Sequence, residues 1–275
     1  MRWPGAALAL LLMGLAGCST AAPAAQSPAA EPTTTSAATA PATEAPPPTQ
    51  PAPAPSTPAV PAPVVVLDPG HNGGNAAHPE VVTAPVPDGA GGTKPCNTTG
   101  TATDAGFAEH AFNWDVALRV RDRLTAAGVA VVLTRQDDSG VGPCVDARGR
   151  LAGEVGASAF VGIHGDGAGA GGRGFHVITS SLDPAGAGVA AGSDALALSI
   201  RDAMTAVVPP GDYVGRNGLD SRPDLAGLNI NAVPAVYVEC GNMRNATDAA
   251  LMSDPAGRAA VADRLATGVL AYLGR

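Results

Sequence analysis

Four residues of the types that bind metals or transfer protons stand beside short apolar segments of the chain. They are His71, Glu109, His164 and Glu239. Two imidazoles and one carboxylate with an open fourth position form a common catalytic zinc shell. A further carboxylate can take a proton from water that the metal activates. A lone histidine at a strand end is more often a hydrogen-bonded structural residue, and the long sequence separations leave open whether the four residues meet.

The segments beside these residues predict the elements that position them. Continuous apolar runs typical of strands buried on both faces end just before His71, His164 and Glu239. Glu109 precedes a helical pattern, where its carboxylate is favoured by the helix dipole. The expected strands are 64–67, 129–133, 159–163, 175–178 and 235–238, and the expected helices are 112–127, 145–155, 193–208 and 257–273.

The alternation of strands and helices predicts an α/β fold. We expect a single domain with a twisted, mostly parallel sheet flanked by helices. Polar residues beyond the carboxyl ends of parallel strands lie at one edge of such a sheet, where ligands bind. The prediction therefore places the four residues in one region of the molecule.

The first residues predict export. Arg2 and the apolar run 6–16 are typical of a secretory signal, and the run is too short for a permanent membrane helix. The segment 15–18, Leu-Ala-Gly-Cys, resembles the lipobox of bacterial lipoproteins, in which the cysteine is acylated. We expect residues 1–18 to be a lipoprotein signal peptide with lipidation at Cys18, and the protein to be lipid-anchored to the outer face of the cell membrane. The alternative is an ordinary signal peptide with a coincidental cysteine.

Residues 19–62 have a different composition from the rest of the chain. They hold 12 of its 26 prolines, and their only charged residues are Glu31 and Glu44. Such a segment cannot bury enough apolar surface to fold, so we expect a disordered Pro/Ala/Thr-rich tether. Residues 63–275 are then the catalytic domain. The net charge of −8 argues against a nucleic-acid partner.

Several segments resemble, in order, those of the zinc-dependent N-acetylmuramoyl-L-alanine amidases. They are 66–71 (VLDPGH), 133–135 with Asp138 and Arg148, 162–166 (GIHGD) and 234–243 (PAVYVECGNM). The resemblance implies hydrolysis of the amide between the lactyl group of N-acetylmuramic acid and the L-alanine of the peptidoglycan stem peptide, in wall remodelling or fragment recycling. It also implies one Zn²⁺ bound by His71, Glu109 and His164, with Glu239 as the catalytic carboxylate. The family pattern favours Glu109 over Glu80 as the acidic ligand, with His110 as a neighbour.

The 37 residues between His71 and Glu109 are longer than in the simplest members of that family. In an oxidising compartment Cys96 and Cys144 are expected to form a disulfide, and a subgroup of actinobacterial amidases is similar around 92–96. The bond would hold this insertion against the second helix and shape one rim of the cleft. Cys240 is expected to be a small buried hydrophobe. A nucleophilic role is disfavoured, because it alternates to the opposite side of its strand from Glu239.

Other polar residues have less specific expectations. Asp68 and Asp166 are candidates to orient a ligand imidazole. Arg135 and Arg148 are expected to form structural ion pairs rather than substrate contacts. The remaining histidines, His78 and His176, are expected at the surface or in the core.

Two other functions remain open for this sequence. They are a zinc carboxypeptidase acting on stem peptides and a non-catalytic wall-binding lipoprotein. A carboxypeptidase would need a pocket for a terminal carboxylate, normally an arginine near the zinc. The expected partners are peptidoglycan or muropeptides and the membrane, and a regulatory protein is not identified.

Overall fold

The structure, a computed structural model, describes residues 61–183 and 185–275. The predicted signal peptide, Cys18 and all but the last two residues of the predicted tether lie outside these ranges. Within them, every helix is too short or too polar to cross a membrane.

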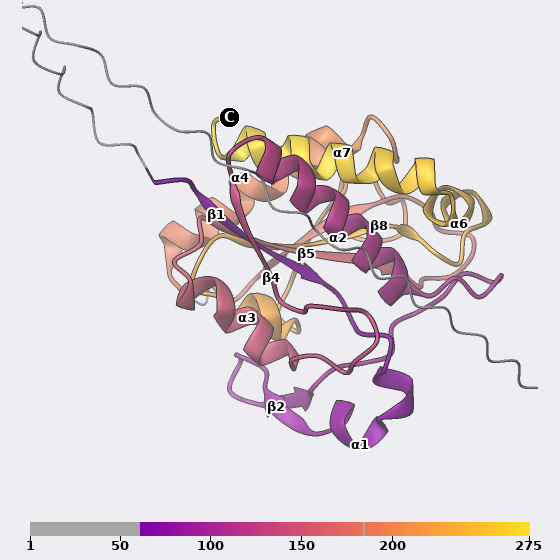
Figure 1. Ribbon diagram of the computed structural model, residues 1–275, viewed down its shortest axis with the longest axis horizontal. Helices are drawn as coiled ribbons and strands as arrows, with labels where there is room; N and C mark the ends of the chain where they lie inside the picture. Colours follow the sequence, from indigo (N-terminus) through magenta and orange to yellow (C-terminus); the bar gives the residue numbers. More distant parts are fainter. Residues whose placement is uncertain (1–60, 184) are drawn as a thin grey trace, which may run out of the picture. The chain divides into compact units, whose positions relative to one another are not determined.

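A six-stranded sheet forms the centre of the domain (Figure 1). Its strands are β1 (Val64–Pro69), β4 (Ala130–Leu133), β5 (Ala159–Asp166), β6 (His176–Ser180), β7 (Leu219–Arg222) and β8 (Ala235–Asn242). The order across the sheet is β4-β1-β5-β8-β6-β7. The first four strands of that order are parallel, β6 is antiparallel to β8, and β7 is parallel to β6. The predicted α/β fold with a mostly parallel sheet is therefore confirmed.

Helices cover both faces of the sheet (Figure 1). The three long helices α2 (Glu109–Ala126), α4 (Ala187–Met204) and α7 (Pro255–Tyr272) pack on one face. The shorter helices α3 (Val145–Glu154) and α5 (Ala226–Asn229) pack on the other, and α6 (Ala246–Ser253) joins β8 to α7. Each face of the sheet carries a hydrophobic core. Alternate residues of β1 contribute to both cores, because Val65 and Leu67 face the long helices and Val66 faces α3.

The central strands are longer than the apolar runs that predicted them. β5 continues through His164 to Asp166, and β8 continues through Glu239 to Asn242. Their polar ends stay in the ladder, so these residues lie in strands rather than in following loops. Cys240 packs with the long-helix core, on the opposite face from Glu239, as the strand alternation predicted.

The insertion, residues 72–108, contains elements that the sequence did not reveal. They are a 3-10 turn (Asn75–Ala77), α1 (Pro79–Val82) and a hairpin of β2 (Pro85–Pro87) and β3 (Thr93–Pro95). The predicted disulfide between Cys96 and Cys144 is present, with Cα atoms 4.5 Å apart. Cys144 is the N-cap of α3, and Val145 N donates to Cys96 O. The bond therefore holds the hairpin to the start of α3.

Candidate active site

His71, Glu109 and His164 converge at the carboxyl edge of the sheet. Oε1 of Glu109 lies 3.1 Å from Nε2 of His71 and 2.9 Å from Nδ1 of His164. One ligand atom from each residue lies within 4.8 Å of the others. Ligand atoms around one tetrahedral zinc, bound at about 2.0–2.1 Å, are separated by roughly 3.4 Å. The donor types and their spacing therefore fit a divalent metal ion.

Glu80 and His110, the residues considered beside Glu109 in the sequence, lie outside this cluster. The side chain of Glu80 is 68% exposed and contacts His78. His110 Nδ1 lies 2.8 Å from Asp138 Oδ2, so His110 is engaged by a different carboxylate. Glu109 is the first residue of α2, where the helix dipole favours a negative charge.

Tight backbone geometry positions the two imidazoles. His71 follows β1 with φ of 59°, in the left-handed region that non-glycine residues rarely adopt. Gly70 lies against the imidazole of His164 so closely that a Cβ atom at this position would overlap the ring. A Cβ atom on Gly100, whose φ is 76°, would lie 2.7 Å from Oε2 of Glu109 and 2.9 Å from Cδ2 of His71. The site therefore depends on glycines that allow the backbone to approach the ligand side chains.

Hydrogen bonds from the end of the insertion and from α2 hold the cluster. His71 Nδ1 lies 3.0 Å from Thr98 O, a contact that leaves Nε2 directed at Glu109. Thr101 N donates to Glu109 Oε2 at 2.9 Å, and Asn113 Nδ2 donates to Oε1 at 3.3 Å. Asn113 lies four residues after Glu109 on one helix face, a spacing that could have identified it. The backbone groups of Thr98 and Thr101 leave no such signal in a sequence.

Asp68 and Asp166 have other partners. Asp68 accepts hydrogen bonds from Arg148 and Thr134, and Asp166 Oδ2 accepts from Tyr213 at 2.8 Å. In the described part of the chain, neither carboxylate makes a hydrogen bond to His71 or His164. An ion pair with the buried Arg148 outcompetes a neutral imidazole for Asp68, since charge-assisted bonds are stronger. The expected ion pairs of the arginines are present, because Arg135 pairs with Asp138 and Arg148 with Asp68.

Glu239 lies beside His164 on the neighbouring strand. The two residues are paired in the β5–β8 register. Together with His71 and Glu109 they line an open depression of about 280 Å³.

The pKa values of Glu109 and Glu239 are shifted in opposite directions. Burial, with the negative charges of Glu109 and Asp166, raises the pKa of Glu239 well above its usual range. Burial also opposes ionisation of Glu109, but hydrogen bonds from His164 and His71 hold its pKa well below its usual range. Paired carboxyl groups whose pKa values are driven apart are typical of acid–base sites. Glu109 is thus suited to bind a cation, and Glu239 to exchange a proton.

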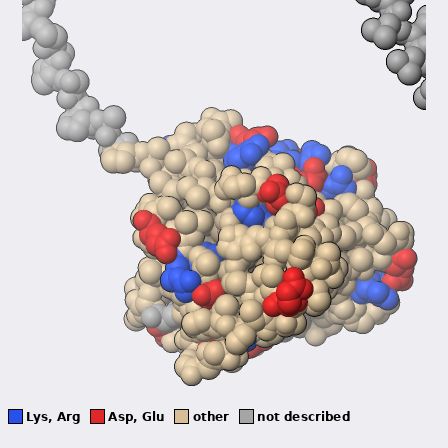
Figure 2. Space-filling model, turned by 60° about the horizontal axis from the view of Figure 1, so that its bottom comes forward, with Lys and Arg blue, Asp and Glu red and all other residues tan. Residues whose placement is uncertain are grey.

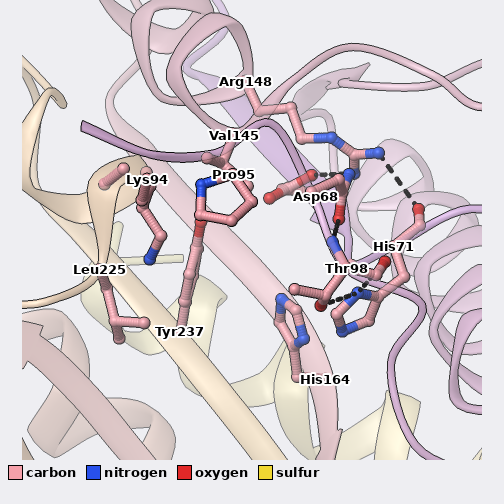
Figure 3. A pocket seen from close by; sticks show the side chains of 14 residues that line it. Asp68, His71, Lys94, Pro95, Thr98, Val145, Arg148, His164, Leu225 and Tyr237 are labelled. Carbon is pink, nitrogen blue, oxygen red and sulfur yellow. Dashed lines mark hydrogen bonds and ion pairs between the residues drawn. The ribbon is translucent and has the colours of Figure 1, made fainter. Parts of the chain in front are cut away.

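A second cavity, of about 140 Å³, shares His71, Thr98 and His164 with the open depression (Figure 3). Lys94 and Pro95 of the hairpin, Leu225 before α5 and Tyr237 of β8 contribute to its walls. In Figure 3 the ion pair of Asp68 and Arg148 lies above the two imidazoles, and Lys94 lies at the left. The insertion therefore forms one wall of the cleft, and the Cys96–Cys144 disulfide fixes this wall to α3.

An α/β sheet whose carboxyl edge carries two imidazoles and a carboxylate in a metal-binding arrangement, with a second carboxylate beside them, is typical of the class of metal-dependent hydrolases. The sequence profile described as N-acetylmuramoyl-L-alanine amidase matches residues 65–271, and the chain belongs to this family.

Similar proteins come from mycobacteria. The N-acetylmuramoyl-L-alanine amidase Rv3717 of Mycobacterium tuberculosis is 44% identical over 211 residues, which cover 76% of this chain and 86% of that protein. The crystal structure of Ami1 from Mycobacterium smegmatis has 47% identity and a TM-score of 0.73, covering 77% of this chain and 97% of that one. The crystal structure of the apo form of Ami1 from Mycobacterium abscessus has 45% identity and a TM-score of 0.73. It covers 78% of this chain and 100% of that chain. The predicted family is therefore confirmed.

Proposed function

We propose that this chain is a zinc-dependent hydrolase of peptidoglycan. It cleaves the amide between the lactyl group of N-acetylmuramic acid and the L-alanine of the stem peptide. The observation that carries the proposal is the convergence of His71, Glu109, His164 and Glu239 in one open depression. Membership of the N-acetylmuramoyl-L-alanine amidase family supports the choice of substrate.

Each residue has a role in this proposal. His71 through Nε2, His164 through Nδ1 and Glu109 would hold the metal. Bound Zn²⁺ supplies a Lewis acid that polarises a carbonyl and lowers the pKa of a water. Glu239 accepts a proton from the attacking water and delivers it to the nitrogen of L-alanine as the carbon–nitrogen bond breaks. The products are a free lactyl carboxylate and a stem peptide with a free amine.

A zinc carboxypeptidase normally binds the terminal carboxylate of its substrate with an arginine near the zinc, and the arginine nearest the imidazoles, Arg148, is already engaged. Arg148 lines the cavity beside both imidazoles. Its guanidinium has five N–H donors. They are directed to five acceptors, namely Pro143 O, Asp68 Oδ1, Pro69 O, His71 O and Asn72 Oδ1. Arg148 therefore has no donor left for a substrate. A purely wall-binding role is disfavoured because all four site residues are present.

The proposal places the enzyme in the cell envelope. Residues 1–18 would direct export with lipidation at Cys18, and residues 19–62 would link the lipid to the catalytic domain. The surface carries mixed charges on the face shown in Figure 2, where Lys and Arg lie among Asp and Glu without forming one large patch. Radiolabelled palmitate should label the wild-type chain, and Cys18→Ser should lose both the label and membrane sedimentation. A labelled Cys18→Ser chain would refute lipidation at this residue.

The function is tested by zinc content and by mass spectrometry of digested muropeptides, for the wild-type chain and Glu239→Ala. We expect stoichiometric zinc in both proteins. The wild type should release intact stem peptides with a free L-alanine amine, and the variant should release none. Trimmed stem peptides would instead assign the chain as a peptidase. Zinc binding without any cleavage would reject the enzymatic proposal for these substrates.

A further inference from the structure

His176 occupies a position beside the site that the proposed mechanism does not use. It is the first residue of β6, and it pairs with Glu239 in the antiparallel ladder of β6 and β8. Residues directly opposite in antiparallel strands project their side chains from the same face, with Cβ atoms about 4.5–5.5 Å apart. Glu239 therefore lies in a row between His164 on β5 and His176 on β6.

This pair contains two buried polar atoms that lack partners. Among the described residues, neither Nδ1 of His176 nor Oε2 of Glu239 has a hydrogen-bond partner. Buried polar atoms are nearly always paired, since leaving one unpaired is costly. One atom can donate and the other can accept, and their residues are adjacent. A hydrogen bond between them would satisfy both atoms at once.

The surroundings of His176 favour a neutral, fixed ring. The residue is 2% exposed, and burial lowers the pKa of its imidazole against the opposing charges of Asp166 and Asp220. The charge of Arg222 acts in the same direction as burial. The ring packs edge to face against Tyr213 at 6.1 Å, and the hydroxyl of Tyr213 donates to Asp166. A neutral imidazole carries one N–H, so a single tautomer can serve Glu239.

We propose that His176 is a positioning residue that donates a hydrogen bond from Nδ1 to Oε2 of Glu239. Oε2 is buried, whereas Glu239 also lines the open depression with His71, Glu109 and His164. The bond fixes the carboxylate so that Oε1 faces that depression, where the proton is exchanged. This inference rests on the proposed role of Glu239 and adds the residue that orients it.

The first test compares steady-state kinetics on muropeptides for the full chain and two variants. His176→Phe fills the volume without a donor, whereas His176→Asn retains an N–H close to the position of Nδ1. We expect His176→Phe to lower kcat about 10- to 100-fold, as loss of an outer-shell contact does, with KM and zinc content unchanged. His176→Asn should recover most of kcat. The control is Ile178→Val, two residues along the same face of β6, which should keep wild-type kcat.

The second test does not depend on activity. Histidine ¹⁵N spectra of the metal-free full chain report which ring nitrogen carries the proton. The chain has five histidines, so the loss of one set of signals in His176→Asn assigns His176. We expect the Nδ1–H tautomer in the wild type and a clear shift of that nitrogen in Glu239→Ala.

The outcomes separate this inference from the proposed function. An Nε2–H tautomer, an Nδ1 signal that ignores Glu239→Ala, or wild-type kcat in His176→Phe would each overturn the inference. If the wild type binds zinc but cleaves no muropeptide, the proposed function fails while the tautomer still decides the hydrogen bond. Should His176→Phe fail to fold, the spectra of the wild type and Glu239→Ala decide the question.

Discussion

Arg148 shows how single residues couple the stability of this domain to its site. It is buried, pairs with Asp68, and donates to the backbone carbonyl oxygens of Pro69 and His71. Those carbonyls belong to the turn that places His71 in its left-handed conformation. The same guanidinium thus neutralises a buried carboxylate and holds the backbone of a proposed metal ligand.

Replacing Arg148 with methionine should destabilise the domain strongly. Arg148→Met leaves Asp68 as a buried charge without its partner, a change that costs about 3–5 kcal/mol of unfolding free energy. Denaturant unfolding measures the loss. The control is Arg150→Met on the same helix, whose half-exposed guanidinium pairs with Asp146 at the surface end of that contact and should contribute about 1 kcal/mol. Equal losses in the two variants would contradict a structural role for the buried pair.

A methyl group at Gly70 should weaken metal binding. Gly70→Ala places its Cβ in the volume of the His164 imidazole, so the ring must move away from Glu109. We expect zinc affinity to fall about 10- to 100-fold, the range seen when the support of a ligand is lost, as measured by competition with a chelating dye. At Gly188 an added Cβ meets nothing within 4 Å, so Gly188→Ala should bind zinc like the wild type. Unchanged affinity in Gly70→Ala would show that the imidazole is not confined there.

At the scale of elements, the insertion links the fold to the site. Its hairpin forms one wall of the cavity beside His164, and the segment that follows contributes the carbonyl of Thr98 to His71. The Cys96–Cys144 disulfide stands between these two parts and joins them to α3. The insertion contributes few residues to the hydrophobic core, and the disulfide holds it in a fixed position.

Removing the disulfide should loosen both the domain and the site. Cys96→Ser with Cys144→Ser opens a loop of sequence separation 48. The chain-entropy relation for a loop of this length gives a loss of about 4 kcal/mol, measurable by denaturant unfolding. Zinc affinity should fall as well, because Thr98 lies two residues after Cys96. Reductant should shift the wild type toward the variant and leave the variant unchanged. A wild type that keeps its stability and proteolytic pattern in reductant would contradict this role.

At the scale of the whole molecule, the chain enters the domain away from the site. The proposed ligands and Glu239 lie at the carboxyl ends of β1, β5 and β8, whereas the first described residues lead into the amino end of β1. Strands that run parallel have their amino ends at one edge and their carboxyl ends at the other. The described residues that lead into β1 are therefore at the opposite edge of the sheet from the cleft.

Removal of residues 1–60 should separate catalysis from localisation. We expect kcat and KM on soluble muropeptides to match those of the full chain, because the cleft is opposite to the point of attachment. In cells, the truncated protein should act less on the wall, because the proposed lipid anchor would raise the effective concentration of the enzyme near its substrate. A large loss of activity on soluble muropeptides would indicate that the removed residues contribute to the site.

Much of the fold was predictable because its signals are local. The apolar runs of β1, β5 and β8 and the helical periodicity of α2, α4 and α7 located the core elements, with differences of a few residues at their ends. The α1 helix and hairpin of the insertion, β7, α5 and α6 escaped prediction. All of these except the eight-residue α6 are three- or four-residue elements, which have no periodicity to read. The extension of β5 and β8 through their polar ends also escaped, since neighbouring strands supply those hydrogen bonds.

The sequence by itself determined the residue types of the site, the family motifs that single out His71, Glu109, His164 and Glu239, and the pairing of Cys96 with Cys144. Only the tertiary structure decided how these groups face one another. Side-chain neighbours across a sheet depend on strand order, direction and register, which arise from packing between distant segments. The reversed direction of β6 brings His176 opposite Glu239, and the path of the insertion brings the carbonyl of Thr98 to His71. Neither arrangement has a local signal, because each is produced by contacts between segments far apart in the chain.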